Sequence, residues 1–497
     1  MLDVLANLGA GFLTVLQPVN LLVLVIGLVL GLLVAVLPGL TLVMGVVLAL
    51  PFTYKLGITP ALVLLTAMYV TGTYGGAITA ILFRIPGEPI DVPLLWDGYK
   101  MARNGAPAKA LGWTLFSALA GGLVAAVVMV ALSEPVARLA LTFSTPEYFA
   151  LVLFGLASCV ALGGGSLLNA LISLLIGLLI ATVGVDSTYG TDRFAFGIDT
   201  LRDGIEYLGV MVGAYGLGEV LSRLERGFSS PALEKVGRIE TKLPGVREIA
   251  ALKGTFARSS LLGIVVGIVP GAGATIASFL SYGLEAQYGP RRKEMGTGIA
   301  EGIVAPQAAA TASVGGAMIP LITLGIPGSG ATAIMLAAFL LHGVQPGPQV
   351  FVSQPGVVYA IFAAVFLSLI GMVLIGYFAI KALVRVLDFN EAAVSALVVM
   401  FCFIGALAQR NNLNDLWTIV VFGGLGYAFE KLRFPIAPMV LGAILGPLAE
   451  SYFLTTMISA DNDWTVFLTR PVSLGLILLS VATVGLTVMR RYQAQKA

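Results

Sequence analysis

Long apolar runs dominate the chain, and many of them exceed the roughly 18 residues that mark a candidate membrane span. Residues 19–37, 107–132, 357–380 and 471–489 are examples. Charged residues gather in short segments between these runs. The pattern predicts an all-α polytopic membrane protein with roughly 11 to 14 membrane segments, some of them broken or re-entrant.

Pro-Gly pairs interrupt four apolar stretches and recur in the same order in the two halves of the chain. GLLVAVLPGLTLVMG at 31–45 is answered by GIVVGIVPGAGATIA at 263–277. GGAITAILFRIPG at 75–87 is answered by GGAMIPLITLGIPG at 315–328. Pro38 therefore corresponds to Pro270, and Pro86 to Pro327. Two related halves with paired broken helices are typical of a secondary transporter.

Charge placement predicts the domain organisation. Residues 1–222 form a first half that begins with an interfacial helix, residues 223–258 a linker, and residues 259–497 a second half with the C-terminal spans. The linker carries eight Lys or Arg against four Glu, so we expect it, together with the C-terminus, in the cytoplasm. Residues 258–291, basic at both ends and broken at Pro270, fit a hairpin better than a crossing.

The two halves are expected to be inverted relative to each other. The segment after the first IPG motif contains Lys100, Arg103 and Lys109, whereas residues 329–356 after the second contain no Lys, Arg, Asp or Glu. Opposite charge in matching loops indicates opposite orientation across the membrane.

Composition narrows the class of protein. Hydrophobic residues make up 58% of the 497 positions and charged residues 11%, against about 25% charged residues in a typical soluble domain. A net charge of +2 gives no field that would recruit nucleic acid. The sequence lacks a GxxxxGK[ST] phosphate loop and the HExxH and GxSxG motifs, so ATP-driven transport and catalysis are both disfavoured. A polytopic intramembrane enzyme and a passive anion channel remain as alternatives.

The broken helices are the candidate binding site. A helix that stops inside a membrane leaves amide and carbonyl groups without partners, and its N-terminus attracts anions. Backbone carbonyls near Gly39 and Gly271 are candidate ligands of Na⁺. We expect no cofactor other than a coupling cation, Na⁺ or H⁺. The predicted substrate-binding residues are Pro38, Gly39, Thr41, Gly76, Thr79, Pro86, Gly87, Gly271, Gly273, Thr275, Gln307, Thr311, Pro327, Gly328, Ser329 and Thr332.

Several long motifs resemble the large membrane subunit of the tripartite tricarboxylate transporter family, the TctA-like proteins. They include LPGL at 37–40, YGGAITAILFRIPGEP at 74–89, VPGAGATIASFLSYGLE at 269–285, LITLGIPGSGATA at 321–333 and VLGAILGPLAE at 440–450. The resemblance implies a multi-pass permease of the bacterial inner membrane that imports organic di- or tricarboxylates by ion symport. It also implies two partners, a small TctB-like membrane subunit and a periplasmic TctC-like solute-binding protein.

One motif departs from the family pattern. Where the family usually resembles PEAANNA, this chain has PQAAATA at 306–312. Gln307 therefore replaces an acid, and Ala310 and Thr311 replace two amides. The changed polar lining favours a carboxylate other than citrate, or a different coupling to cations.

Overall fold

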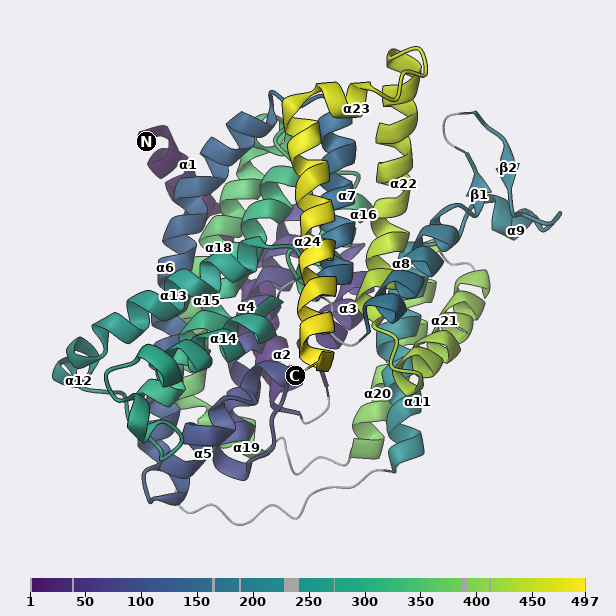
Figure 1. Cartoon of the computed structure of the whole chain (residues 1–497). Helices are drawn as coiled ribbons and strands as arrows, with labels where there is room; N and C mark the ends of the chain where they lie inside the picture. The colour runs from purple at the N-terminus through teal and green to yellow at the C-terminus, as the bar shows by residue number, and fades with distance from the viewer. Residues whose placement is uncertain are drawn as a thin grey trace. The chain divides into compact units, whose positions relative to one another are not determined.

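The computed structural model describes residues 2–37, 40–162, 166–186, 189–227, 241–271, 273–385, 391–410 and 413–496 (Figure 1). These residues are almost entirely helical, and seven of their helices are long and apolar enough to cross a membrane. Six further apolar helices are shorter. The predicted all-α polytopic fold is confirmed, whereas the number of crossings stays a prediction.

The chain divides into two compact units that cut across the two predicted halves. Unit 1 comprises Met1–Ala137 and Ser229–Val394, and unit 2 comprises Arg138–Phe228 and Ser395–Ala497. Each unit thus takes sequence from both halves. All four Pro-Gly interruptions belong to unit 1, so unit 1 holds the candidate site.

Unit 1 contains the broken helices and the helices that surround them. The predicted linker is partly helical at its ends, and its residues 228–240 lie outside the described part of the chain. The elements are α1 (Leu2–Val15), α2 (Pro18–Val36), α3 (Leu42–Thr53), α4 (Ile58–Phe83), η1 (Pro89–Asp91), α5 (Leu94–Arg103), α6 (Pro107–Ala140), α12 (Val246–Ala251), α13 (Lys253–Ile268), α14 (Gly273–Tyr288), η3 (Arg292–Glu294), α15 (Glu301–Leu324), α16 (Gly330–Leu341), α17 (Val350–Ser353), α18 (Pro355–Phe378) and α19 (Ile380–Arg385).

Unit 2 is also helical, apart from one small antiparallel pair of strands in which Gly184 faces Arg193. An ion pair between Arg193 and Glu450 joins this pair of strands to α22. The elements are α7 (Thr145–Leu162), α8 (Leu167–Ala181), β1 (Gly184–Val185), β2 (Asp192–Arg193), α9 (Asp199–Arg202), α10 (Tyr207–Met211), the π-helical η2 (Val212–Leu217), α11 (Gly218–Arg226), α20 (Glu391–Arg410, which begins in unit 1), α21 (Leu413–Lys431), α22 (Ile436–Ser459), α23 (Val466–Thr469) and α24 (Pro471–Lys496).

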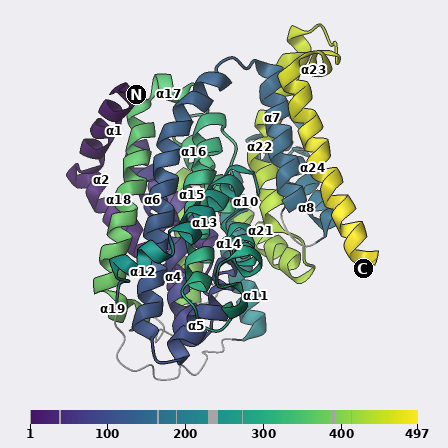
Figure 2. The ribbon, with the colours of Figure 1, turned by 60° about the vertical axis from the view of Figure 1, so that its left-hand side comes forward.

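Helices α4 and α15 form the centre of unit 1. The most apolar stretch of α4 is 100% buried and that of α15 is 94% buried. Both helices are rich in Gly, Ala and Thr, residues small enough to let helix backbones approach one another inside a membrane. Protein rather than lipid therefore surrounds these two helices (Figure 2).

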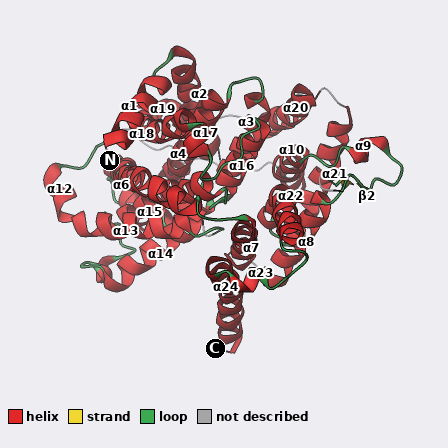
Figure 3. Cartoon of the chain, turned by 90° about the horizontal axis from the view of Figure 1, so that it is seen from above, coloured by secondary structure: helices red, strands yellow, loops and turns green. Residues whose placement is uncertain are grey.

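Glycines bring the helices of each half into backbone contact. A Cβ atom added at Gly75 of α4 would lie 2.9 Å from the carbonyl oxygen of Leu32 in α2. One added at Gly267 of α13 would lie 2.9 Å from Cα of Ser313 in α15. Helix α2 thus packs closely along α4, and α13 along α15 (Figure 3).

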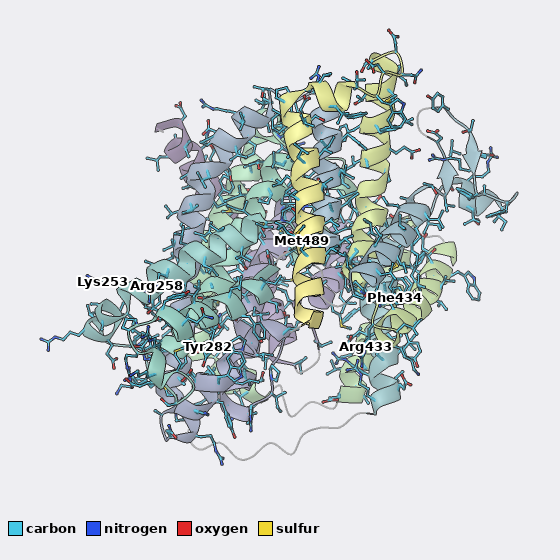
Figure 4. All side chains as sticks on the ribbon, in the orientation of Figure 1. Lys253, Arg258, Tyr282, Arg433, Phe434 and Met489 are labelled. Carbon is cyan, nitrogen blue, oxygen red and sulfur yellow. The ribbon has the colours of Figure 1, made fainter. Side chains whose placement is uncertain are left out.

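Helices α13 and α14 form a hairpin around the break at Pro270. Arg258 near the start of α13 donates to Glu285 near the end of α14 over 2.8 Å, and Thr255 donates to the same carboxylate over 3.1 Å. Figure 4 labels Arg258 beside these helices. The segment therefore returns to the end of the unit from which it started, as the charge pattern predicted; on which side of the membrane it opens stays a prediction.

Asp97 joins the two halves within unit 1. Its carboxylate lies in α5, is fully buried, and accepts hydrogen bonds from the backbone amides of Gly296, Gly298 and Ile299 at 2.9, 2.7 and 3.0 Å. The hydroxyl of Tyr282, labelled in Figure 4, donates a fourth at 2.8 Å. Four donors compensate the loss of water around this carboxylate. Asp97 therefore fixes the segment after the first IPG motif against the loop before α15.

Candidate substrate site at the helix breaks

The two IPG motifs follow helix ends of the same geometry. α4 ends at Arg84 (φ 60°) and α15 at Gly325 (φ 70°), both in the left-handed conformation. At each end, the amide of the cap residue donates to the carbonyl four residues earlier, and the next amide donates to the carbonyl six residues earlier. The bond from the left-handed residue to the carbonyl four residues earlier is that of the αL motif, which terminates helices. Arg84 adopts it without the freedom of glycine, and its guanidinium lies 5.7 Å from the ring centroid of Tyr99.

The glycine of each IPG motif occupies an equivalent place. A Cβ atom added at Gly328 would lie 2.7 Å from the carbonyl oxygen of Gly267 and 2.9 Å from Cα of Ala317. One added at Gly87 would lie 2.5 Å from the carbonyl oxygen of Ala35 and would overlap Cα of Gly76. Ala35 and Gly267 both stand three residues before the proline of the earlier break. Each IPG glycine therefore lets the second break of its half pack directly against the residues just before the first break.

The breaks of the two halves meet inside unit 1. The amide of Gly271 donates to the carbonyl of Gly328 over 3.1 Å, which joins the two breaks of the second half. Gly330, at the start of α16, lies against Val43 of α3. In the reciprocal contact, Ser278 of α14 donates to the carbonyl of Ile90 over 2.7 Å. The segment after each IPG motif therefore packs against the helix that follows the first break of the other half.

Protein side chains cap the starts of α3 and α16. Thr41 accepts from the amide of Met44 over 3.2 Å, and the side chain of Glu88 accepts from the amide of Leu42. Ser329 and Thr332 form a reciprocal capping box at α16, in which the Ser329 amide donates to the Thr332 hydroxyl over 2.7 Å. These caps satisfy amides that would otherwise be orphaned inside the membrane.

The start of α14 differs from the other two. Gly271 and Gly273 have φ angles of 80° and 61°, where a side chain would strain the backbone. An added Cβ at Gly273 would meet nothing within 4 Å, and Thr275 in the first turn is partly exposed. Ala272 lies outside the described residues. The described first turn of α14 thus borders open space, as a site for an anion requires.

A buried polar cluster connects α4 with α15. The side-chain amide of Gln307, 1% exposed, donates to the carbonyl of Thr73 over 3.0 Å and to the hydroxyl of Thr311 over 3.2 Å. The hydroxyls of Tyr69 and Ser329 share a hydrogen bond of 2.9 Å. Gln307 therefore links α15 to α4, and Ser329 links the start of α16 to α4.

The structure brings most of the predicted site residues together, but not all of them face open space. Gly76, Gly87 and Gly328 are buried and act in packing. Thr79 is fully buried, and its hydroxyl donates to the carbonyl of Gly76 in its own helix. Pro86 and Pro327 stand beside their packed glycines. Pro38 and Gly39 lie outside the described residues.

Sequence reasoning missed four polar residues at the breaks: Tyr69, Glu88, Asp91 and Ser278. Asp91 is 2% exposed, and its Oδ2 accepts from the Glu88 amide over 2.9 Å. A carboxylic acid beside a membrane break is a functional candidate by default, and this signal was available for Glu88 and Asp91. Because basic residues follow them, the whole segment was expected to be a loop.

A charged pocket lies elsewhere in unit 1. It has a volume of about 520 Å³ and is lined by residues of α6, α12, α13 and the loop before α15. Its cations are paired: Lys109 with Glu248 at 2.6 Å, and Arg291 with the buried Glu301 at 3.4 Å. The hydrogen bond from Lys109 lowers the pKa of the Glu248 carboxyl. Glu301 therefore serves in an ion pair, away from the breaks.

A metal centre of the usual kind is not found. Within the described ranges, no group of three or more His, Cys, Asp or Glu side chains is placed to hold a metal ion. Cys159 and Cys402 are both buried and unbridged.

Broken helices that meet inside a bundle of apolar helices define a polytopic membrane transport protein. The family model of the tripartite tricarboxylate transporter TctA family matches residues 21–441. The chain belongs to this family of transporters, which points to a protein that is not an enzyme.

Two curated relatives come from Agrobacterium vitis. One, an uncharacterized 52.8 kDa protein in the TAR-I ttuC' 3' region, is 34% identical over all of this chain and 98% of its own length. The other, an uncharacterized protein in the TAR-II ttuC' 3' region, is 34% identical over 47% of this chain and 97% of its own length. No solved structure gives a significant match.

Proposed function

We propose that the chain is the permease subunit of a tripartite transporter that uses an ion gradient to import organic di- or tricarboxylates. The observation that carries the proposal is the meeting of helix breaks from both halves within unit 1, where the start of α14 borders open space. A carboxylate of charge two or three near the bilayer midplane needs donors already aimed at it, and helix N-termini supply them.

The start of α14 and the capping box of α16 are the proposed substrate contacts. Gly273 and Thr275 offer amides and a hydroxyl, and Ser329 adds a second hydroxyl, whereas the amide of Gly271 is already bonded to Gly328. The Tyr69 hydroxyl holds Ser329 in place. α3 is a poorer contact for an anion, because the carboxyl of Glu88 already occupies its first amide.

The halves are proposed to be inverted repeats. Two observations support this: the matching left-handed helix ends at Arg84 and Gly325, and the equivalent packing positions of Gly87 and Gly328. If the halves are related by a two-fold axis, each half can adopt the conformation of the other, and the site can then open to either side of the membrane.

The proposed setting is the bacterial inner membrane, with a small membrane subunit and a periplasmic solute-binding protein as partners. Membership of a tripartite family supports the partnership. The basic linker and the basic C-terminal residues Arg490 and Arg491 support a cytoplasmic location for both segments.

Uptake is expected to depend on an ion gradient and not on ATP. The three proteins would be reconstituted in proteoliposomes, and the probe would be a radiolabelled carboxylate chosen because the periplasmic protein binds it in a screen of mono-, di- and tricarboxylates. Uptake should appear when a Na⁺ or H⁺ gradient is imposed and stop when an ionophore dissipates it. Uptake that continues without a gradient and requires ATP would refute the proposal. Downhill flux alone, without concentration of the probe, would favour an anion channel.

Thiol labelling tests the proposed orientation. In a background with Cys159→Ala and Cys402→Ala, Arg247→Cys and Gln495→Cys should resist an impermeant thiol reagent added to intact cells. Asn462→Cys, in the exposed acidic loop after α22, should react. Permeabilised cells, in which all three should react, provide the control. Labelling of Arg247→Cys or Gln495→Cys from outside would reverse the orientation.

A further inference from the structure

The turn after the first IPG motif holds two carboxyl groups with little compensation. Glu88 and Asp91 lie three residues apart, and the Glu88 amide donates to Asp91 Oδ2 over 2.9 Å. Asp91 is 2% exposed, and its other oxygen, Oδ1, has no hydrogen-bond partner. An added Cβ at Gly76 would overlap Asp91 Oδ2, so α4 presents a glycine where the carboxyl enters.

No described basic side chain neutralises this pair. The nearest candidate in sequence, Arg84, is exposed and lies over the ring of Tyr99. Glu88 receives the amide of Leu42 and with it the positive end of the α3 dipole, worth roughly half a charge. Asp91 Oδ1 receives nothing comparable. A buried carboxylate beside a half-buried one, with no cation between them, carries a large desolvation cost.

The neighbouring titratable groups are engaged elsewhere or uncharged. Tyr69 of α4 bonds to Ser329. From α14, Ser278 reaches this turn, whereas Tyr282 bonds to Asp97 and Glu285 pairs with Arg258. Glu301 of α15 pairs with Arg291. A positive charge is therefore missing from the turn itself.

We propose that Glu88 and Asp91 together bind one monovalent cation, Na⁺ or a proton, and that this is the ion whose gradient drives uptake. The inference rests on the proposed transport function. As Na⁺ ligands the two carboxyls supply hard oxygen donors, with Asp91 Oδ1 free to coordinate. If the ion is a proton, it neutralises one of the two carboxylates and so removes the repulsion between them.

The position of the pair explains how cation and substrate would be coupled. Glu88 caps α3 at Leu42, next to Val43, and Val43 contacts Gly330 of α16. Gly330 directly follows Ser329, a proposed substrate contact whose amide bonds to Thr332. An empty pair of ionised carboxylates repels an anionic substrate in this low-dielectric region, and one bound monovalent cation weakens that repulsion by halving the negative charge. Binding of each therefore favours binding of the other.

Cation binding can be measured on the purified full chain without any transport. The thermal midpoint of unfolding would be recorded in NaCl and in choline chloride of equal ionic strength, at several pH values. A Na⁺ site predicts a higher midpoint in NaCl, because a ligand that binds only the folded state stabilises it. A proton site predicts no Na⁺ effect but a pH-dependent midpoint. Either response should be lost in Asp91→Asn, in Glu88→Gln and in the double variant.

Glu294→Gln, which alters an exposed carboxylate of the same unit, is the matched control and should keep the wild-type response. A variant is compared with the wild type only if it unfolds cooperatively, which shows that it is folded. Two different single variants are used so that the test does not depend on the folding of one of them. A wild-type response to Na⁺ or pH that survives in both single variants and in the double variant would overturn the proposal. So would a wild-type midpoint insensitive to Na⁺ and to pH.

The outcome is separable from that of the transport assay. A cation response that depends on Glu88 and Asp91, combined with gradient-independent uptake, would leave the site standing and refute the proposed function. Gradient-driven uptake combined with an unchanged cation response in the variants would do the reverse.

Discussion

Replacing Gly328 by alanine is expected to abolish uptake or reduce it severely. The added Cβ would lie 2.7 Å from the carbonyl oxygen of Gly267 and 2.9 Å from Cα of Ala317. Both are backbone atoms, which cannot turn aside as a flexible side chain can. Overpacking of this kind costs about 1 to 3 kcal/mol, which lowers the population of the transport-competent conformation roughly 5- to 150-fold. Gly87→Ala should behave alike, because Gly87 meets Ala35 and Gly76 in the same way.

The measurement is initial uptake at matched amounts of membrane-inserted protein. Gly424→Ala is the control, since an added Cβ at Gly424 in α21 would meet nothing within 4 Å, and its uptake should match that of the wild type. Wild-type uptake by Gly328→Ala and Gly87→Ala would mean that a larger residue is tolerated at the IPG glycines without loss of transport. The breaks would then serve only in packing.

Replacing Gln307 by glutamate is expected to stop uptake near neutral pH and to restore part of it in acid. The side-chain amide of Gln307 donates to the carbonyl of Thr73 and to the hydroxyl of Thr311 at a position that is 1% exposed. An ionised glutamate has no donor, so one carboxylate oxygen would face the Thr73 carbonyl oxygen. Burial of an unpaired charge costs several kcal/mol. A protonated glutamate has one O–H group and can donate again, which sets the direction of the pH effect.

Uptake would be followed from pH 5 to 8 against the wild type at the same imposed ion gradient. Gln349→Glu, at an exposed position before α17, should follow the wild-type profile. A Gln307→Glu variant as active as the wild type at pH 7 would show that the amide does not face Thr73 as described, and would remove Gln307 from the polar cluster.

Much of the fold could be predicted because proline and glycine mark its interruptions. The sequence located the breaks at Pro86, Pro270 and Pro327, and α4, α13 and α15 end just before them. Proline alone was not a sufficient signal. Pro306 and Pro320 lie inside α15 without ending it, because a membrane-embedded helix can satisfy the freed carbonyl through neighbouring groups. In these stretches the proline that is followed by glycine marks the break, and the prolines inside α15 do not.

The polar interior of unit 1 was less accessible to sequence reasoning. Tyr69 and Ser329 share a hydrogen bond across 260 residues, and no local pattern reports such a contact. Residues 94–103, expected as part of a loop, form α5, whose buried Asp97 binds three backbone amides. Glu88 and Asp91 turn inward although basic residues follow them within the same segment. The structure of these residues depends on contacts with distant parts of the chain and not on local composition.

The interleaved division of the chain has a consequence for its biosynthesis. Unit 1 cannot be completed until the ribosome has passed its second stretch, Ser229–Val394, because the whole of Arg138–Phe228 belongs to unit 2. Tyr69 waits 260 residues for Ser329, which at about 5 to 20 residues per second is on the order of ten seconds to a minute. During that interval the first breaks, with the carboxyls of Glu88 and Asp91, stand in the nascent chain without their later neighbours. Polar residues of unit 1 must therefore be kept from unfavourable contact with lipid during membrane insertion, until the second stretch of the unit has been translated.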